Sequence, residues 1–247
     1  MNGKAKPYPK RDSQFKHIKH MRETYTRHGL PVISIDTKKK ELIGNFKRAG
    51  TEYRPKKSPR PVNDHDFCDE HAVPYGIYDC KKNFGFVNLG HSKDTAKFAV
   101  ESIRRWWNLY GKIEYPDAKK MLIFADSGGS NGYNRRMFKK YLAQLSQEIG
   151  VVFRMCHYPP GCSKYNPVEH RFFSEISVST QAQPITSLSE FAEFIRHTTT
   201  ETGLRAMCVI DNNIYPTKEK IGKHEYDALP IRRSSIVSEL NYWIGEG

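Results

Sequence analysis

The sequence MLIFAD at residues 121–126 decides the fold class, because a continuous apolar run here ends on an acid. Such a run is typical of a strand that is buried on both faces, in a sheet covered by helices. A second run, VVFRM at residues 151–155, follows a stretch in which Tyr, Met, Leu and Ile recur every four positions. This spacing forms one face of a helix, so the two runs predict parallel strands joined by a helix.

A hairpin and a further strand precede this pair. Two aromatic-rich runs, at residues 73–78 and 84–89, flank a turn of Asp, Cys, two Lys and Asn, and this pattern predicts an antiparallel hairpin. Residues 32–37 form a short β-rich run upstream of the hairpin, and residues 13–28 have the spacing of a helix.

Helices follow the hairpin and the last buried strand. We expect Asp94 to cap an amphipathic helix that ends at Gly111. Asn166 and the proline after it are typical of the cap and first turn of another helix, and residues 189–199 and 206–210 predict a further helix and a late strand. Three antiparallel strands followed by helix-linked parallel strands predict an α/β, ribonuclease-H-like mixed sheet flanked by helices. A Rossmann sheet would instead alternate strand and helix from the start.

The chain of 247 residues divides into a helical extension over residues 1–30 and one large domain over residues 31–247. A proline-rich basic excursion near residues 53–70 interrupts the domain. Hydrophobic residues make up 38% of the chain, enough to exclude disorder throughout. No apolar run reaches the roughly 18–20 residues that a membrane span needs.

Basic residues outnumber acidic ones, with 40 Lys and Arg against 27 Asp and Glu and a formal net charge of +13. They occur as pairs and triplets along the whole chain, which predicts a broad basic face for a polyanion such as nucleic acid. Binding through phosphates weakens steeply as salt rises, so we expect salt-dependent DNA binding with little sequence preference.

Five cysteines without a CxxC pair favour a reducing cytosol over a disulfide scaffold. Cys156, His157 and Cys162 are close in sequence, but structural zinc sites have tighter cysteine pairs, so we favour two core cysteines and a loop histidine. The DHD at residues 64–66 lies in the proline-rich excursion, where we favour a solvated loop over a metal site. The absence of GxSxG, HExxH and GxxxxGK[ST] removes support for serine hydrolases, zincins and P-loop enzymes.

Three acids lie where such a sheet brings its elements together. Asp36 lies in the first strand, Asp126 ends a buried strand, and Glu169 lies in the first turn of the helix that Asn166 opens. Carboxylates that converge there are suitable ligands for magnesium. Two such ions, about 3.5–4 Å apart, activate the attacking oxygen and stabilise the leaving oxygen of a phosphodiester.

Each acid also has a simpler explanation. Asp36 can pair with a nearby lysine at a strand edge, Asp126 can start an Asx turn, and Glu169 can form a capping box with Asn166. However, Asp36 and Asp126 emerge from apolar runs, where an unpaired carboxylate is costly. Glu169 shares a helical face with apolar residues. Together these features favour a metal site.

Several long segments carry a family resemblance. They are PVISIDTKKKE at 31–41, NDHDF at 63–67, DTAKFAVESIRRWW at 94–107, ADSGGSNG at 125–132 and PPGCSKYNPVEHRFF at 159–173. They resemble the DDE insertion-sequence transposases, above all the group called Rhodopirellula-type transposases. The resemblance runs from about residue 13 to near the C-terminus.

The resemblance implies a ribonuclease-H-like DDE catalytic domain that cleaves DNA and transfers strands, with Asp36, Asp126 and Glu169 as the catalytic and metal-binding triad. It implies Mg²⁺, with Mn²⁺ as a substitute and two ions in the site. The implied partners are element ends and target DNA, bound by a dimer or larger assembly of a cytoplasmic, nucleoid-associated bacterial protein. Our candidates for phosphate contacts are Lys38, Lys39, Lys40 and Lys164.

Two other functions stay open: a structure-specific nuclease of the same fold, which cuts but never joins, and a DNA-binding remnant without catalysis. Full-length relatives carry a DNA-binding region ahead of the catalytic core, whereas 35 residues precede Asp36 here. We therefore expect a catalytic fragment, the product of a truncated element, or a subunit that relies on a partner for end recognition. Strand-transfer and metal-dependent nicking assays separate these functions.

Overall fold

The computed structural model describes residues 8–48, 50 and 70–246. Most of the proline-rich excursion near residues 53–70 lies outside this range. The DHD at residues 64–66 and the segment 63–67, which carries part of the family resemblance, lie outside it as well. The helices are α1 (Arg11–Arg27), α2 (Ala96–Trp106), η2 (Trp107–Gly111), α3 (Lys112–Glu114), α4 (Arg136–Ile149), η3 (Ser163–Tyr165), η4 (Glu169–Phe173), α5 (Ser174–Ser179), α6 (Leu188–Arg196) and α7 (Lys223–Asp227). The strands are β1 (Val32–Thr37), β2 (Glu41–Leu42), β3 (His71–Asp79), β4 (Phe84–Gly90), β5 (Lys120–Ala125), β6 (Val152–His157), β7 (Arg205–Asp211), β8 (Ile231–Arg233) and β9 (Asn241–Ile244).

The strands form one mixed sheet in the order β7-β4-β3-β1-β5-β6-β9-β8, with β2 paired to β3. β1, β3 and β4 are antiparallel, and β5 and β6 continue parallel to β1. The predicted ribonuclease-H-like mixed sheet is therefore confirmed. The sequence did not predict α7, β8 and β9, because elements of three to five residues contain too little periodicity to be recognised.

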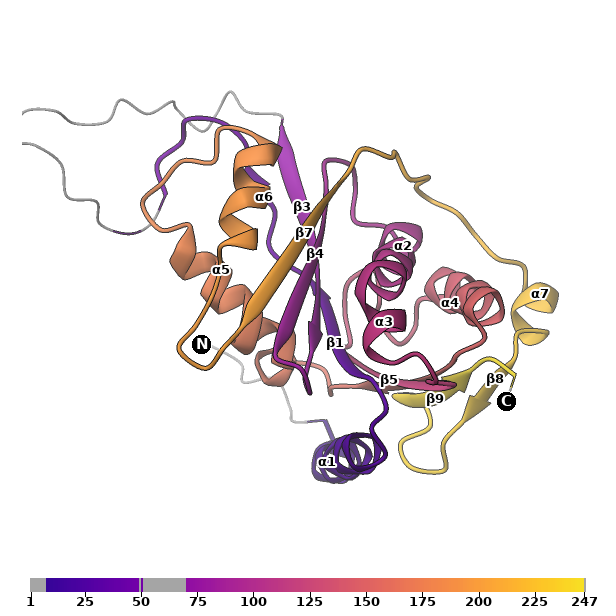
Figure 1. Cartoon of the computed structure of the whole chain (residues 1–247). Helices are drawn as coiled ribbons and strands as arrows, with labels where there is room; N and C mark the ends of the chain where they lie inside the picture. The colour runs from indigo at the N-terminus through magenta and orange to yellow at the C-terminus, as the bar shows by residue number, and fades with distance from the viewer. Residues whose placement is uncertain (1–7, 49, 51–69, 247) are drawn as a thin grey trace, which may run out of the picture.

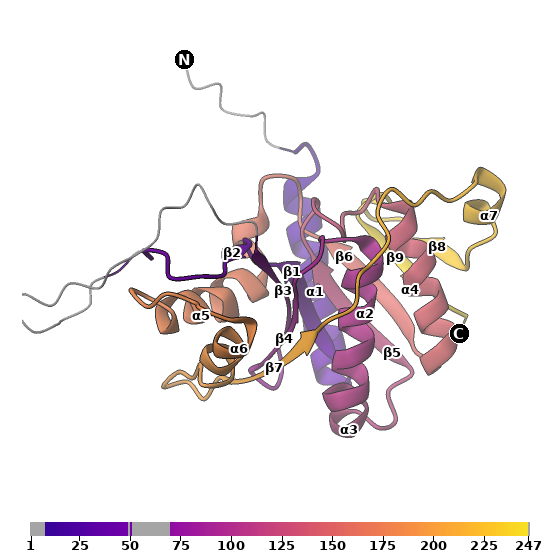
Figure 2. The same ribbon diagram turned by 90° about the horizontal axis from the view of Figure 1, so that it is seen from above.

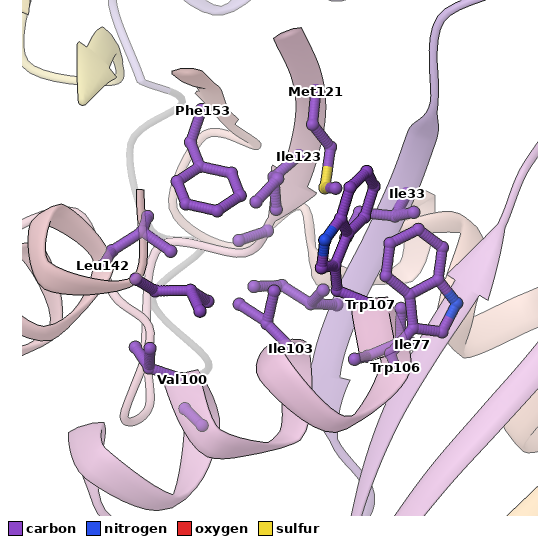
Figure 3. Close-up of a cluster of buried hydrophobic side chains, with 14 of the residues drawn as sticks. Ile33, Ile77, Val100, Ile103, Trp106, Trp107, Met121, Ile123, Leu142 and Phe153 are labelled. Atoms are coloured by element: carbon purple, nitrogen blue, oxygen red, sulfur yellow. The ribbon is translucent and has the colours of Figure 1, made fainter. Parts of the chain in front are cut away.

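Helices cover both faces of the sheet (Figures 1 and 2). On one face, α2 and α4 pack over the central strands, because alternate residues such as Ile33 and Ile35 point to that side. Figure 3 shows this core, in which sheet residues meet residues of α2, η2 and α4: Ile33, Ile77, Met121, Ile123 and Phe153 with Val100, Ile103, Trp106, Trp107 and Leu142. No helix in the described part of the chain is long and apolar enough to cross a bilayer.

Two separate helical groups cover the opposite face. α1 packs on β1, β5 and β6, where Val32, Leu122 and Phe124 supply the intervening alternate positions. η4, α5 and α6 pack on β3, β4 and β7. The boundary between these two groups lies over β1, so the helix that carries Glu169 begins directly above that strand.

Two predicted helix ends are wrong. Thr95, and not Asp94, caps α2, because its Oγ1 accepts a hydrogen bond from the Phe98 N–H at 3.2 Å. Gly111 does not end the helix, since η2 and α3 continue it to Glu114. Gly111 is required by packing instead: a Cβ there would press against the rings of Trp106 and Trp107.

Glycines in β3 and β4 allow η4 to approach the sheet closely. A Cβ on Gly76 would overlap the ring of Phe173, and a Cβ on Gly85 would overlap the ring of Phe172. Gly76 is also the cross-strand partner of Asp36. The same close approach therefore sets the height of the Glu169 helix above the strand that carries Asp36.

We predict that Gly76→Ala lowers the free energy of unfolding by about 1–3 kcal/mol, because the added methyl overpacks the site. Urea denaturation measures the change. Adding Phe173→Leu should recover part of the loss, since the two side chains compete for one space. The control is Gly222→Ala, where a Cβ meets nothing within 4 Å and we expect a change below about 0.5 kcal/mol. Equal effects at the two glycines would contradict the packing argument.

Candidate active site

The register of the two central strands brings Asp36 and Asp126 together. β1 and β5 are parallel, and Ile35 lies level with Ala125. The next residue on each strand is therefore an acid, at the same edge of the sheet. Neighbouring strands lie about 4.8 Å apart, so the convergence expected from the sequence for these two acids is present.

A hydrogen-bond network around Ser34 joins the Glu169 helix to β1. Ser34 Oγ donates to Asn166 Oδ1 at 2.6 Å and accepts from the Val168 N–H at 2.9 Å. Asn166 Nδ2 donates to the Ile35 carbonyl at 3.0 Å. Ser34, Asn166 and Val168 are all buried, so each polar group finds its partner across the two elements.

This network corrects the proposed capping arrangement at Asn166. Asn166 stands before the helix as expected, but its side chain bonds to β1 rather than to the helix N–H groups. The Ser34 hydroxyl instead satisfies the Val168 N–H at the start of the helix. Glu169 does not serve the capping box, because its carboxyl shares a hydrogen bond with Asp36.

The three carboxyl groups form one electrostatic unit. Asp36 is 8% exposed, and burial, with the charges of Asp126 and Glu169, raises its pKa to about 8. Burial also raises the pKa of Asp126 and of Glu169. Asp36, the most buried of the three, therefore holds a proton near neutral pH and shares it with Glu169.

The donor set fits hard divalent cations, which prefer carboxylate oxygens. Clustered carboxylates that retain a proton near neutral pH show that the site lacks positive charge, which a cation would supply. The three carboxyl groups do not surround a common point at which an ion could bind. Within residues 8–48, 50 and 70–246, no group of three His, Cys, Asp or Glu is arranged to hold an ion. Cation binding would therefore have to displace the shared proton and draw the carboxylates together.

The candidate phosphate contacts differ in their surroundings. Lys38 is buried, and its Nζ forms an ion pair with Glu41, which also pairs with Arg48 at 3.0 Å. Lys39 and Lys40 are exposed and line a cavity of about 800 Å³. The exposed Lys164 lies with its Nζ 5.3 Å from the centre of the Tyr165 ring.

His157 supports Asp126 in a way that the sequence analysis missed. Its Nδ1–H donates to the Asp126 carbonyl at 2.8 Å, and its Nε2 accepts from the Tyr242 hydroxyl at 2.8 Å. Burial lowers the pKa of His157 to about 4, so the ring stays neutral. It is a strand residue and not the expected loop histidine. Cys156, the preceding residue on β6, points into the α1 core on the other face.

A fourth acid, Asp94, lies beside the triad. Its charge contributes to the raised pKa of Asp126, and burial raises the pKa of Asp94 itself. The buried Tyr75 side chain is within electrostatic reach of Asp94, Asp36 and Asp126. The sequence signal for Asp94, its place before a helix, suggested a cap, so its position near the acids was not expected.

The chain is similar in sequence to one protein family and in fold to solved structures. A family model described as "Rhodopirellula transposase DDE domain" matches residues 2–245, whereas no curated protein matches the chain. The structure "Mos1 transposase paired-end complex with left transposon end" is similar, with a TM-score of 0.50 and 13% identity over 78% of this chain and 56% of that chain. The "Crystal structure of the Mos1 Strand Transfer Complex" has a TM-score of 0.49 and 10% identity over 78% and 56% of the two chains.

The structural likeness supports the ribonuclease-H-like fold, and the match spans a little over half of the Mos1 chain. The family match rests on the sequence itself and covers nearly the whole chain. It includes the strand that carries Asp36, the strand that directly precedes Asp126 and the helix that carries Glu169. This chain belongs to the Rhodopirellula transposase DDE domain family.

Proposed function

We propose that Asp36, Asp126 and Glu169 are the catalytic triad with which this transposase domain cleaves and joins DNA, using two divalent ions, Mg²⁺ or Mn²⁺. The observation that carries the proposal is the cluster of three buried or half-buried carboxyl groups, all with raised pKa values, at one edge of β1 and β5. A buried cluster of like charges destabilises a fold unless a ligand or a function compensates for it. The family assignment supplies the reaction class.

The reaction consists of two phosphoryl transfers. In the first, the oxygen of water bonds to phosphorus, the P–O3′ bond breaks, and a proton reaches the departing 3′ oxygen. In the second, the oxygen of that 3′ hydroxyl bonds to a phosphorus of target DNA and loses its proton, the P–O3′ bond of the target breaks, and a proton reaches the departing 3′ oxygen. Bound divalent ions supply positive charge for the attacking and leaving oxygens in both steps.

The chain's own residues hold this arrangement in place. Asp36 interacts with both Asp126 and Glu169, so it would hold divalent ions together with either of them. Ser34 and Asn166 fix Glu169 relative to β1, and His157 fixes the backbone of Asp126. Positioning of this kind contributes to catalysis because the ligands need not reorganise during the reaction.

We propose DNA as the substrate because the chain has a formal net charge of +13, which favours binding of a polyanion. We propose Lys39, Lys40 and Lys164 as phosphate contacts and assign Lys38 a supporting role, because its charge is engaged by Glu41. Element ends and target DNA are the proposed partners. A dimer or larger assembly on DNA would allow two element ends to be held together.

We predict that Asp126→Asn abolishes nicking of supercoiled DNA in Mg²⁺ or Mn²⁺ without unfolding the protein, because the amide keeps the shape and loses the charge that holds a cation. In chelator the variant should melt above wild type. A carboxyl with a raised pKa stabilises the folded state only while it is protonated. In the wild-type protein this stabilisation is lost as pH rises from about 4 to about 8, the folded-state pKa of Asp36. The difference in melting temperature should therefore widen from pH 5 to pH 8.

The control for this prediction is Asp117→Asn, an exposed acid away from the cluster. It should nick normally and show no pH-dependent gain in stability. Normal nicking by a well-folded Asp126→Asn protein would remove Asp126 from the proposed triad.

We predict that Glu169→Gln cuts nicking by orders of magnitude and moves the melting temperature by only a few degrees. A neutral amide binds a hard cation poorly, whereas the helix start is held by Ser34 and stays intact. In a domain of this size about 1 kcal/mol shifts the melting temperature by roughly 2–4 °C. A melt paired with the nicking assay tests both parts. Lost stability with normal nicking would assign Glu169 a structural role.

A further inference from the structure

A cavity of about 770 Å³ opens beside the acid cluster. Its walls are the start of α2, the loop after Asp126, the start of α4, and the segment between β7 and α7. Figures 1 and 2 show that segment passing α2 on its way to α7. The loop wall includes Gly129 and Ser130, which directly follow the Gly128 whose N–H bonds to Asp126. The cavity and the acids therefore share one loop.

The cavity is strongly basic. Its lining has five cationic side chains and two acidic ones: Lys93, Arg135, Arg136, Lys218 and Lys220 against Asp94 and Glu219. Glu219 already accepts a hydrogen bond from the Tyr141 hydroxyl at 2.6 Å. No ion pair within the described part of the chain neutralises Lys93, Lys218 or Lys220. An anionic ligand would relieve this excess of positive charge.

The segment between β7 and α7 is anchored in a way that presents its lysines. The Tyr215 hydroxyl donates to Asp211 Oδ2 at 2.6 Å, and Tyr215 and Ile221 are both buried. Lys218 and Lys220 lie between these anchors and are exposed. The anchors thus hold two cations over the cavity without engaging their charges.

Two helix starts reinforce the preference for an anion. The first residues of α2 and α4 both line the cavity. No side chain caps α4, so the N–H groups of its first turn remain available to phosphate oxygens.

The cavity lies close to the acids that are proposed as the catalytic triad. Asp94 lines the cavity and contributes to the raised pKa of Asp126. Lys40 and Arg135, the latter in the cavity wall, are both within electrostatic reach of Asp94. Lys40 and a cationic residue of the cavity wall therefore both lie close to the acids.

We propose that this cavity binds backbone phosphates of the DNA strand next to the scissile phosphodiester. The proposal rests on DNA being the substrate, as proposed above, and assigns the cavity as a second contact region. Phosphate oxygens would meet the lysines and the first turn of α4. The contacts position the strand and read no bases.

The test compares two double variants with the same loss of charge. Lys218→Ala/Lys220→Ala removes two cavity lysines, and Lys119→Ala/Lys120→Ala removes two exposed lysines at the opposite end of β5. Fluorescence anisotropy with a labelled duplex of arbitrary sequence gives affinity from 50 to 300 mM salt, in chelator so that no cleavage occurs. Thermal melts check that both variants are folded.

For the cavity variant, we expect affinity at 0.1 M salt to fall on the order of tenfold, and the slope of log affinity against log salt to decrease by about 2, close to 0.9 for each lost phosphate contact. The control variant should keep most of the wild-type slope. Equal losses in the two variants, or a wild-type slope in the cavity variant, would overturn the proposal. Because binding is measured without metal, absent nicking by wild type would count against the catalytic proposal and leave this result intact.

Discussion

The hydroxyl of Ser34 is the contact on which the proposed site depends. It is a side chain of the central strand, yet it satisfies the N–H of Val168 at the start of the helix that carries Glu169. Through Asn166 the same hydroxyl is bonded to the loop before that helix. A buried network of this kind is costly when any member is missing. The network therefore fixes the position of the helix relative to β1, and this position places Glu169 beside Asp36.

The rest of the fold supports this relation from both faces. Gly76 and Gly85 leave room for the rings of Phe173 and Phe172. Because these glycines have no side chain, the Glu169 helix can lie close to the sheet. His157 and Tyr242 hold the backbone at Asp126 from the other side of the strand pair. The fold therefore keeps three carboxyls together although burial, together with the charges of neighbouring acids, raises their pKa values. This stored repulsion is the physical argument for a cation site.

Local patterns were enough to predict the central strands and the meeting of two acids. The run before Asp126 and the run before Asp36 are apolar, and in parallel neighbours their ends must lie at one edge. Features that depend on distant partners were not predictable in this way. Asn166 has the sequence of a cap but bonds to β1, and Tyr242 lies in a strand of four residues whose role depends on β6. Asp94 has the same limitation, since only the tertiary fold brings it to Asp126.

The most direct test of the account is anomalous diffraction from crystals of the protein soaked in Mn²⁺. We expect manganese bound by carboxylate oxygens of Asp36 and Asp126, at about the 2.0–2.2 Å typical of small divalent ions, with Glu169 completing the shell of a second ion. Glu169 should then have exchanged its hydrogen bond to Asp36 for the metal. Manganese bound only elsewhere, with the Asp36–Glu169 hydrogen bond intact, would contradict the assignment of these three acids as the catalytic centre.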